Sequence, residues 1–339
     1  MTLRVLCAKR TGVQKNRRFL HIKPVALILA DVSMDLALKL QDPRAHVLFV
    51  VAHPDDEVIG AGGSLLSRLK HCTVVHVTDG APVNMLDARS LGFNVRSDYA
   101  QARREESAQA LSLAGISRNQ IIDFGITDQE ASYELVSLVR HLARLIYETK
   151  PEIVITQPYE GGHPDHDSTA FAVHGARQLL IDRKATAPQI FEMTSYHQRE
   201  ERTVYSDFVW RADCFQLTFE LSADQRRLKR KMFDCFVTQQ KVLQWFPIEV
   251  ERFREAPEYD FTQPPHTGKL HYEYFDWGMT GNRWRSLASE AEMVLRQGGI
   301  YDAHDFERSV STDASWPGRC RRSRTDTDLP GCSTGARRP

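Results

Sequence analysis

The chain has 339 residues, which is long for a single domain but within reach of one elaborated α/β domain. Apolar residues make up 42% and charged residues 26%, the composition of an ordinary globular protein, and the formal net charge is zero. No global charge favours a nucleic-acid partner, and no apolar run reaches the ~18 residues that a helix spanning a bilayer requires. We therefore expect neither a nucleic-acid partner nor an integral membrane segment.

The first 43 residues are expected to form an N-terminal extension that is partly disordered. Residues 1–30 are rich in lysine and arginine and contain no acidic residue. A leader is the alternative, but the apolar run at 25–30 is short and no clear small-residue cleavage site follows it. The six cysteines are scattered without a Cys-x-x-Cys pair, which suits a reducing compartment, so we expect a cytoplasmic protein.

Strand and helix patterns alternate between residues 44 and 195, which predicts a parallel sheet covered by helices on both faces. The predicted strands cover 47–51, 73–78, 121–124, 153–156 and 189–193. Helices are expected from about 98 to 114, from 132 to the proline at 151, and from 167 or 168 onward. The pattern indicates the α/β class, with the parallel core in residues 44–195.

Residues 196–308 are expected to form a smaller C-terminal α+β region of the same domain, which as a whole covers 44–308. A β-rich stretch is predicted at 203–220, and the capping box that starts at Ser222 opens a long helix with Leu243 on its apolar face. Residues 255–285 are rich in proline, histidine and aromatic residues and are expected to be ordered but irregular. The composition of residues 309–339 predicts a disordered tail.

Two clusters of ionisable residues follow predicted strands. His53, Asp55 and Asp56 come directly after the strand at 47–51, and His163-Pro164-Asp165-His166 follows the strand at 153–156. Open α/β sheets bind their ligands beyond the carboxyl ends of the strands, so we expect the two clusters to meet around one metal ion. His53, Asp56 and His166 are the predicted ligands. This set suits a catalytic Zn²⁺ that keeps one position for water, although Fe²⁺ and Co²⁺ stay open.

Three further residues of these clusters are candidates for catalysis. Asp55 adjoins a ligand and is expected to be the general base that takes a proton from the metal-bound water. His163, when protonated, can stabilise an oxyanion or give a proton to a leaving amine, and Asp165 can orient a histidine. The structural alternative is that both clusters are capped turns before helices, but two such turns after two buried strands favour a site.

The glycine-rich segment from Gly60 to Ser64 raises the alternative of a dinucleotide-binding loop. Leu65 stands where that fingerprint needs its third glycine, and the acidic cluster follows the strand directly. Close packing of a helix is therefore the expected role of these glycines.

Ala52-His53-Pro54-Asp55-Asp56-Glu57, together with His163-Pro164-Asp165-His166, resembles the motifs of the LmbE-like family, also called the PIG-L deacetylases. The likeness covers roughly residues 44–240. It implies a Rossmann-like, mostly parallel sheet flanked by helices, a Zn²⁺ ion, and hydrolysis of an N-acetyl group on an amino sugar. The resemblance also implies that His53, Asp56 and His166 are the metal ligands. It further implies that Asp55 is the general base and that His163 stabilises the tetrahedral intermediate.

The same resemblance implies contacts with the sugar. Arg103, or Arg104 in its place, and Asp128 match positions that tend to meet the sugar in this family. Some members carry a tyrosine two residues before the first histidine of the second motif, near the oxyanion. Gly161 stands there in this chain, and Tyr159 is the candidate to replace that tyrosine.

We therefore expect a Zn²⁺-dependent hydrolase that removes acetate from a small N-acetylated amino-sugar substrate and leaves a free amine. The alternatives are an amidase for a larger acyl or conjugate amide, and a protein that binds a metal or sugar without turnover. Loops near 81–97 and 255–285 are expected to set specificity, while the sugar, the pathway and the oligomeric state stay open.

Overall fold

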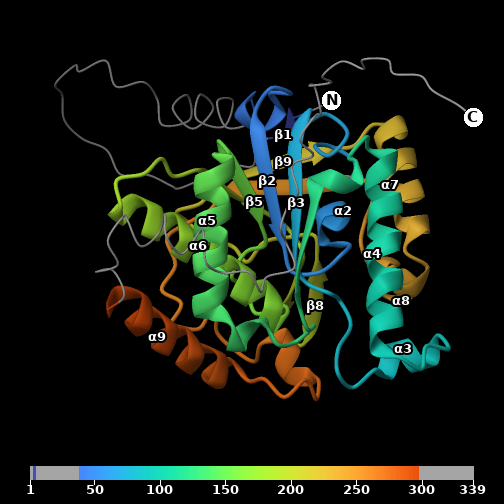
Figure 1. Cartoon of the computed structure of the whole chain (residues 1–339). Helices are drawn as coiled ribbons and strands as arrows, with labels where there is room; N and C mark the ends of the chain where they lie inside the picture. Colours follow the sequence, from blue (N-terminus) through green and yellow to red (C-terminus); the bar gives the residue numbers. More distant parts are fainter. Residues whose placement is uncertain (1–2, 5–37, 298–339) are drawn as a thin grey trace, which may run out of the picture.

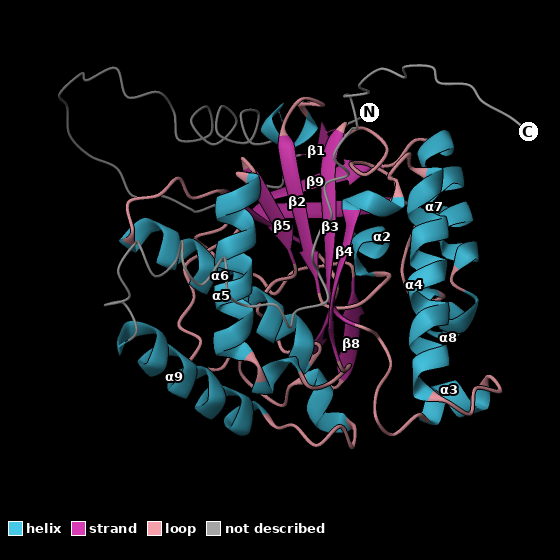
Figure 2. Cartoon of the chain, viewed as in Figure 1, coloured by secondary structure: helices cyan, strands magenta, loops and turns pink. Residues whose placement is uncertain are grey.

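A computed structural model describes residues 3–4 and 38–297 of the chain. Most of the expected N-terminal extension, the end of the C-terminal region and the whole predicted tail lie outside the described residues. An eight-stranded sheet forms the centre of the molecule (Figures 1 and 2). Its strands are β1 (Leu3–Arg4), β2 (His46–Val51), β3 (His71–Thr78), β4 (Ile121–Ile126), β5 (Ile153–Thr156), β6 (Gln189–Met193), β9 (Gln216–Glu220) and β10 (Val250–Glu255).

The strand order is β1-β9-β10-β6-β5-β2-β3-β4. The five strands from β6 to β4 are parallel, and β10, β9 and β1 extend that sheet by antiparallel pairing. The chain starts the parallel part at β2, builds outward through β3 and β4, and then returns to the other side with β5. The order of the strands therefore reverses between β2 and β5, which is the usual ligand-binding position in such sheets.

Helices cover both faces of the sheet (Figures 1 and 2). Helices α4 (Arg96–Leu113) and α7 (Ala223–Cys235) lie on one side, while α5 (Leu135–Thr149), α6 (Pro164–Asp182) and α9 (Gly281–Gln297) lie on the other. The shorter elements are α2 (Asp56–Ala61), α3 (Leu86–Ser90), α8 (Gln240–Leu243), the 3-10 turns η1 (Arg118–Gln120), η2 (Ala131–Tyr133), η3 (Val237–Gln239) and η4 (His271–Tyr274), and the hairpin of β7 (Tyr196–Arg199) and β8 (Arg202–Tyr205).

Strand β2 shows why both faces must be covered. Val47, Phe49 and Val51 enter the apolar cluster under α4 and α7, whereas Leu48 and Val50 enter the cluster under α5 and α6. All five side chains are fully buried. Because successive residues of a strand point to opposite faces, an uninterrupted apolar run fits only a strand with helices on both sides. Each such burial contributes about 1.5–3 kcal/mol.

The predicted strands and the α/β class are confirmed, but several helices and strands differ from the prediction. Helix α6 begins at Pro164 rather than at 167 or 168, because proline is well tolerated at the first helical position and the His163 side chain caps the helix. The helix after Ser222 ends at Cys235, and Leu243 belongs to the separate α8. Strand β10 and helix α9 were not predicted.

The glycines after the first motif pack the α2 segment against its neighbours. A Cβ atom on Gly60 would collide with the side chain of Met193, and one on Gly63 would collide with Leu221. The packing role that we expected for this glycine-rich segment is confirmed.

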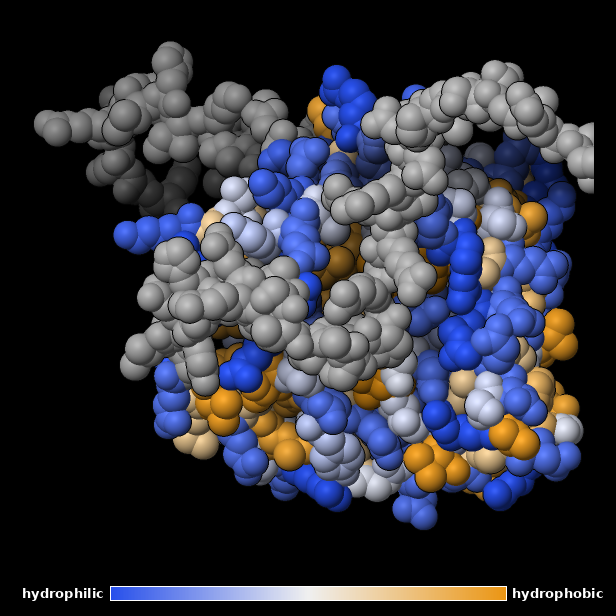
Figure 3. All heavy atoms as spheres, viewed as in Figure 1, coloured by the Kyte–Doolittle hydropathy of each residue, from blue (hydrophilic) through white to orange (hydrophobic). Residues whose placement is uncertain are grey.

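Among residues 3–4 and 38–297, no helix is both long enough and apolar enough to cross a membrane. On the face seen in Figure 3, hydrophobic residues form separate patches among hydrophilic side chains.

Candidate metal centre

The predicted ligands come from the carboxyl ends of β2 and β5, at the point where the strand order reverses. His53 lies in the turn between β2 and α2, Asp56 opens α2, and His166 lies in the first turn of α6. The Asp56 carboxylate accepts the backbone N–H of His53 at 2.8 Å, which holds the turn so that both side chains converge. All three residues are buried.

The donor atoms of these residues form a compact triangle. His53 Nδ1 lies 3.2 Å from His166 Nε2 and 3.2 Å from one Asp56 oxygen, and His166 Nε2 lies 3.3 Å from the other Asp56 oxygen. Neighbouring ligand atoms of a tetrahedral zinc site, with bonds of about 2.0–2.1 Å, lie about 3.3 Å apart. Two ring nitrogens and a carboxylate at this spacing fit a divalent cation.

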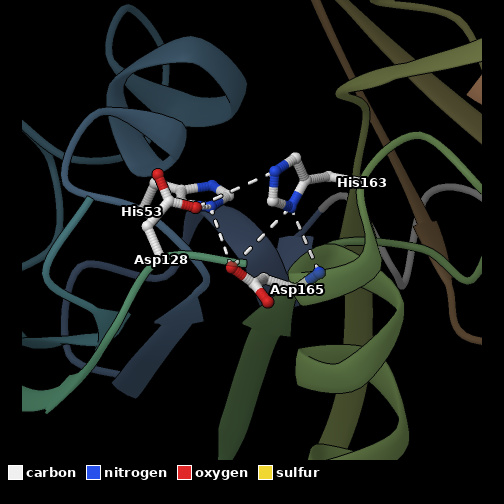
Figure 4. Close-up of side chains that lie close together, drawn as sticks. All are labelled: His53, Asp128, His163 and Asp165. Atoms are coloured by element: carbon white, nitrogen blue, oxygen red, sulfur yellow. Dashed lines mark hydrogen bonds and ion pairs between the residues drawn. The ribbon is translucent and has the colours of Figure 1, made fainter. Parts of the chain in front are cut away.

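A second group of polar side chains surrounds the other ring nitrogen of His53 (Figure 4). His53 Nε2 lies 3.1 Å from Asp128 and 3.4 Å from Asp165. The Asp165 carboxylate already takes part in other hydrogen bonds, because its two oxygens accept the backbone N–H groups of Gln129 and Ala131 at 2.6 and 3.1 Å. The polar atoms of His53, Asp128, His163 and Asp165 also lie close enough together to hold a metal ion. The hydrogen bonds of the two carboxylates instead favour a role in orienting the His53 ring.

Asp55 points to a different neighbour from Asp56. Its carboxylate accepts a hydrogen bond of 3.0 Å from Arg103, whose guanidinium also donates to the carbonyl of Gly80 at 2.9 Å. Burial raises the pKa of Asp55 to about 6, although the positive charge of Arg103 opposes the rise. Arg104 instead donates to Gln101 within the same helix, so Arg103 is the arginine that reaches the site.

The His163 imidazole is held in one protonation state. Its Nδ1 accepts the backbone N–H of Asp165 at 3.1 Å, which leaves the proton on Nε2. Burial lowers the pKa of His163 well below its ordinary value, and His53 repels a charge there as well. A lowered pKa favours a neutral imidazole that can donate through Nε2, whereas the sequence argument considered the role of the ring when protonated.

Asp128 and Tyr159 differ in how close they come to this centre. The Asp128 carboxylate faces His53 and lies 3.8 Å from His163 Nε2. Tyr159 is buried in the core, where its ring stacks on Trp284 and its hydroxyl donates to the backbone carbonyl of Gln263 at 2.9 Å. Tyr159 therefore points away from the donor triangle, and we no longer propose it as a substrate contact.

Tyr196 is the residue that the sequence interpretation missed. Its ring lies 5.3 Å from the ring of His166. The backbone turn at Gly161 has a φ of +67°, and a Cβ on Gly162 would collide with the carbonyl oxygen of Tyr196. Tyr196 follows β6 by three residues, so the strand-end rule that identified His53 could also have found it.

Behind the donor triangle, Glu57 and His76 form a buried polar pair. His76 lies 3.4 Å from Glu57 and 3.0 Å from Asp123. Burial alone would lower the pKa of His76, but the charges and hydrogen bonds of Glu57 and Asp123 together outweigh burial and raise the pKa to about 9. His76 is therefore a core histidine whose two ring nitrogens face carboxylates.

Comparisons with known proteins converge on one family. The PIG-L family model, described as GlcNAc-PI de-N-acetylase, matches residues 48–176, which include both motifs. The chain is 30% identical over 172 residues to the "Probable N-acetyl-alpha-D-glucosaminyl L-malate deacetylase 2" of Bacillus subtilis, covering 49% of this chain and 75% of that protein. It is 31% identical over 150 residues to the "Diacetylchitobiose deacetylase" of Thermococcus kodakarensis, covering 40% of this chain but only 51% of that protein.

Among solved structures, the A40926 pseudoaglycone deacetylase Dbv21 resembles the chain with a TM-score of 0.49 and 19% identity, over 64% of this chain and 99% of that one.

Proposed function

This chain belongs to the PIG-L family, and from that premise we propose that it hydrolyses the acetamide of an N-acetylated amino sugar, releasing acetate and a free amine. The relatives named above, a glucosaminyl malate deacetylase and a diacetylchitobiose deacetylase, support the substrate class. The observation that carries the proposal is the donor triangle of His53, Asp56 and His166, with Asp55 beside it.

We propose Zn²⁺ as the metal, held by His53 Nδ1, the Asp56 carboxylate and His166 Nε2. Two nitrogens and one carboxylate at 3.2–3.3 Å from one another support this choice. When bound, such a cation polarises an amide carbonyl and lowers the pKa of water. Asp165 and Asp128 keep the proton of His53 on Nε2, which leaves Nδ1 with a free lone pair for the cation.

The protein residues around the triangle complete the reaction. Asp55 takes a proton from the attacking water as its oxygen adds to the amide carbon, and Arg103 holds the Asp55 carboxylate in place. His163 donates a hydrogen bond from Nε2 to the oxyanion that develops. When the C–N bond breaks, the proton on Asp55 passes to the nitrogen, so the products are acetate and the amine. Asp128, beside His163, is proposed to accept a hydrogen bond from the sugar.

Acetate release from N-acetylglucosamine and from its glycosides tests this proposal. We expect release that stops when a chelator removes the metal and returns when Zn²⁺ is added. Glucosamines carrying longer N-acyl chains distinguish the amidase alternative, because faster hydrolysis of those amides would replace the deacetylase assignment. Binding of Zn²⁺ and sugar without any hydrolysis would instead indicate a non-catalytic protein.

A further inference from the structure

A continuous series of aromatic rings runs beside the donor triangle. Starting at His166, neighbouring ring centres are separated by 5.3 Å to Tyr196, 5.0 Å to His271, 5.1 Å to Phe275, 4.6 Å to Trp277 and 4.7 Å to His163. His163 and His166 close the circle at 5.4 Å. We call Tyr196, His271, Phe275 and Trp277 the aromatic collar.

The aromatic collar joins two distant segments at the metal centre. Tyr196 opens β7, whereas the other three members lie in η4 and the turn after it, before α9. The backbone N–H of His271 donates to the carbonyl of Gly161 at 2.9 Å, which ties this turn to the loop that carries His163. The collar is therefore a fixed part of the site rather than a distant surface.

Part of the collar is open to solvent, although it adjoins buried catalytic candidates. The Phe275 side chain is 46% exposed, and Trp277 and Tyr196 are half-buried, while His163 is only 5% exposed. Phe275 and Trp277 stack at an interplanar angle of 12°. Aromatic side chains that are partly exposed beside a polar centre can contact a ligand bound at that centre.

Tyr196 adds a polar group to the aromatic collar. Its hydroxyl makes no hydrogen bond to any other residue in 38–297 that the structure describes. A tyrosine hydroxyl is protonated at neutral pH and can therefore act as a donor to a ligand.

We propose that the aromatic collar is the subsite for the pyranose ring of the substrate, an inference that rests on the proposed function. A pyranose has an apolar C–H face and a polar edge of hydroxyl groups. Phe275 and Trp277 would contact the apolar face, and the Tyr196 hydroxyl would meet the polar edge, while the acetamide lies at His163. Rings alone would also accept an acyl chain, but the unpartnered hydroxyl favours a sugar.

The affinity for N-acetylglucosamine in variants of the collar tests this proposal. Trp277→Ala and Phe275→Ala are expected to raise KM about threefold to tenfold and to change kcat less than about threefold, because a ring contact contributes modestly and equally to ground and transition states. Trp277→Phe keeps a ring and is expected to retain most of the affinity. Tyr274→Ala is the matched control, since Tyr274 is 47% exposed in the same turn but contacts the Lys269 ammonium.

Saturation-transfer NMR provides a readout that does not depend on turnover. With Asp55→Ala protein, irradiation of protein aromatic protons is expected to transfer magnetisation to the ring C–H protons of N-acetylglucosamine. The signal should weaken strongly in Asp55→Ala/Trp277→Ala and stay unchanged in Asp55→Ala/Tyr274→Ala. If Trp277→Ala does not fold, Phe275→Ala and Trp277→Phe carry the same comparison.

The failures of the two proposals can be told apart. If the wild-type protein deacetylates the sugar while Trp277→Ala and Phe275→Ala keep its KM and NMR signal, the collar proposal is overturned and the function stands. If KM rises only for N-octanoylglucosamine, the collar binds the acyl chain and the proposal is also wrong. If no N-acetylated sugar is hydrolysed or bound, the proposed function itself fails.

Discussion

Asp55 and Asp56 are neighbours in the sequence, but their surroundings assign them different chemistry. Burial raises the pKa of Asp55 to about 6 against the opposing charge of Arg103. Asp56 is equally buried, yet the charge and hydrogen bond of His166 hold its pKa well below the ordinary value. One carboxylate therefore stays ionised beside two imidazoles, whereas the other can exchange a proton, and this division is what a metal ligand and a general base require.

Replacing Asp55 by Ala should separate these two roles. We expect Asp55→Ala to bind one equivalent of Zn²⁺ per chain and to lose about 10²–10⁴ in kcat, the usual contribution of a positioned general base. Asp56→Ala, its matched control, should lose the metal itself. Metal analysis of both purified variants, together with acetate release, makes the comparison. An Asp55→Ala enzyme with wild-type turnover would remove the assignment of the base.

The sequence was sufficient for residues whose chemistry follows from their place at a strand end. His53, Asp56 and His166 converge as the motif spacing predicted. It was insufficient where side-chain direction decides: Arg103 and Arg104 are adjacent on α4, and only the helical rotation brings Arg103 to Asp55. The direction of Tyr159 into the core likewise depends on packing against Trp284, which lies far along the chain.

At the scale of elements, α7 and β10 together secure the end of the segment that carries Asp56. The Lys229 ammonium of α7 donates to the carbonyl of Ile59 at 2.7 Å and to Glu251 of β10 at 2.8 Å. The Glu251 carboxylate also accepts the backbone N–H groups of Gly63 and Ser64 at 2.8 and 2.9 Å. The Lys229 and Glu251 side chains are both fully buried, so the charge of each is compensated by the opposite charge of the other.

Lys229→Met should therefore destabilise the fold strongly. The variant leaves the Glu251 carboxylate buried without its counter-charge, and the expected loss is about 3–5 kcal/mol of unfolding free energy. Arg296→Ala, which removes an exposed ion pair with Glu292, is the control and should cost less than about 0.5 kcal/mol. Urea unfolding measures both variants. A Lys229→Met protein as stable as the Arg296→Ala control would show that this pair does not secure the element.

The buried charged residues of β10 explain why this strand was not predicted from the sequence. The strand reads Val-Glu-Arg-Phe-Arg-Glu, whose charges suggest a solvated segment, yet Glu251 and Arg254 are both buried. Their partners come from α7, from β6 and from the loop after β5, so no local pattern identifies them. The parallel strands β2 and β5, in contrast, could be predicted because each is an almost continuous apolar run.

At the scale of the whole molecule, Arg254 connects the antiparallel strands to the loop that leads to His163. Its guanidinium donates to Glu192 at 2.7 Å and to Glu160 at 3.0 Å, and Tyr259 donates to Glu192 at 2.7 Å. Two buried carboxylates thus share one guanidinium. Burial raises the pKa of Glu160 from 4.5 to about 8, and repulsion from Glu192 adds to the rise while Arg254 opposes it.

This shift predicts a decline of stability with pH. Between pH 4.5 and about 8, the folded chain keeps a proton on Glu160 that the unfolded chain has released. Stability from this group is therefore fully present below its unfolded pKa and is lost as the pH rises through the folded value. The slope is at most about 1.4 kcal/mol per pH unit.

Urea unfolding between pH 5 and 9 tests this decline, with Glu160→Gln as the comparison. The variant cannot release the proton, so its unfolding free energy should fall less steeply with pH than that of the wild-type protein. If the unfolding free energies of the two proteins fall in parallel with pH, Glu160 has the same pKa in the folded and unfolded chain, and the prediction is wrong.

We propose that His53, Asp56 and His166 bind one divalent cation where the strand order reverses, between β2 and β5. Anomalous X-ray diffraction at the zinc edge, from crystals of the Zn²⁺-reconstituted chain, tests it directly. We predict one ion with His53 Nδ1, His166 Nε2 and an Asp56 oxygen at about 2.0–2.2 Å. An ion bound among Asp128, His163 and Asp165 instead, or no ion near His53, would contradict this assignment of the ligands.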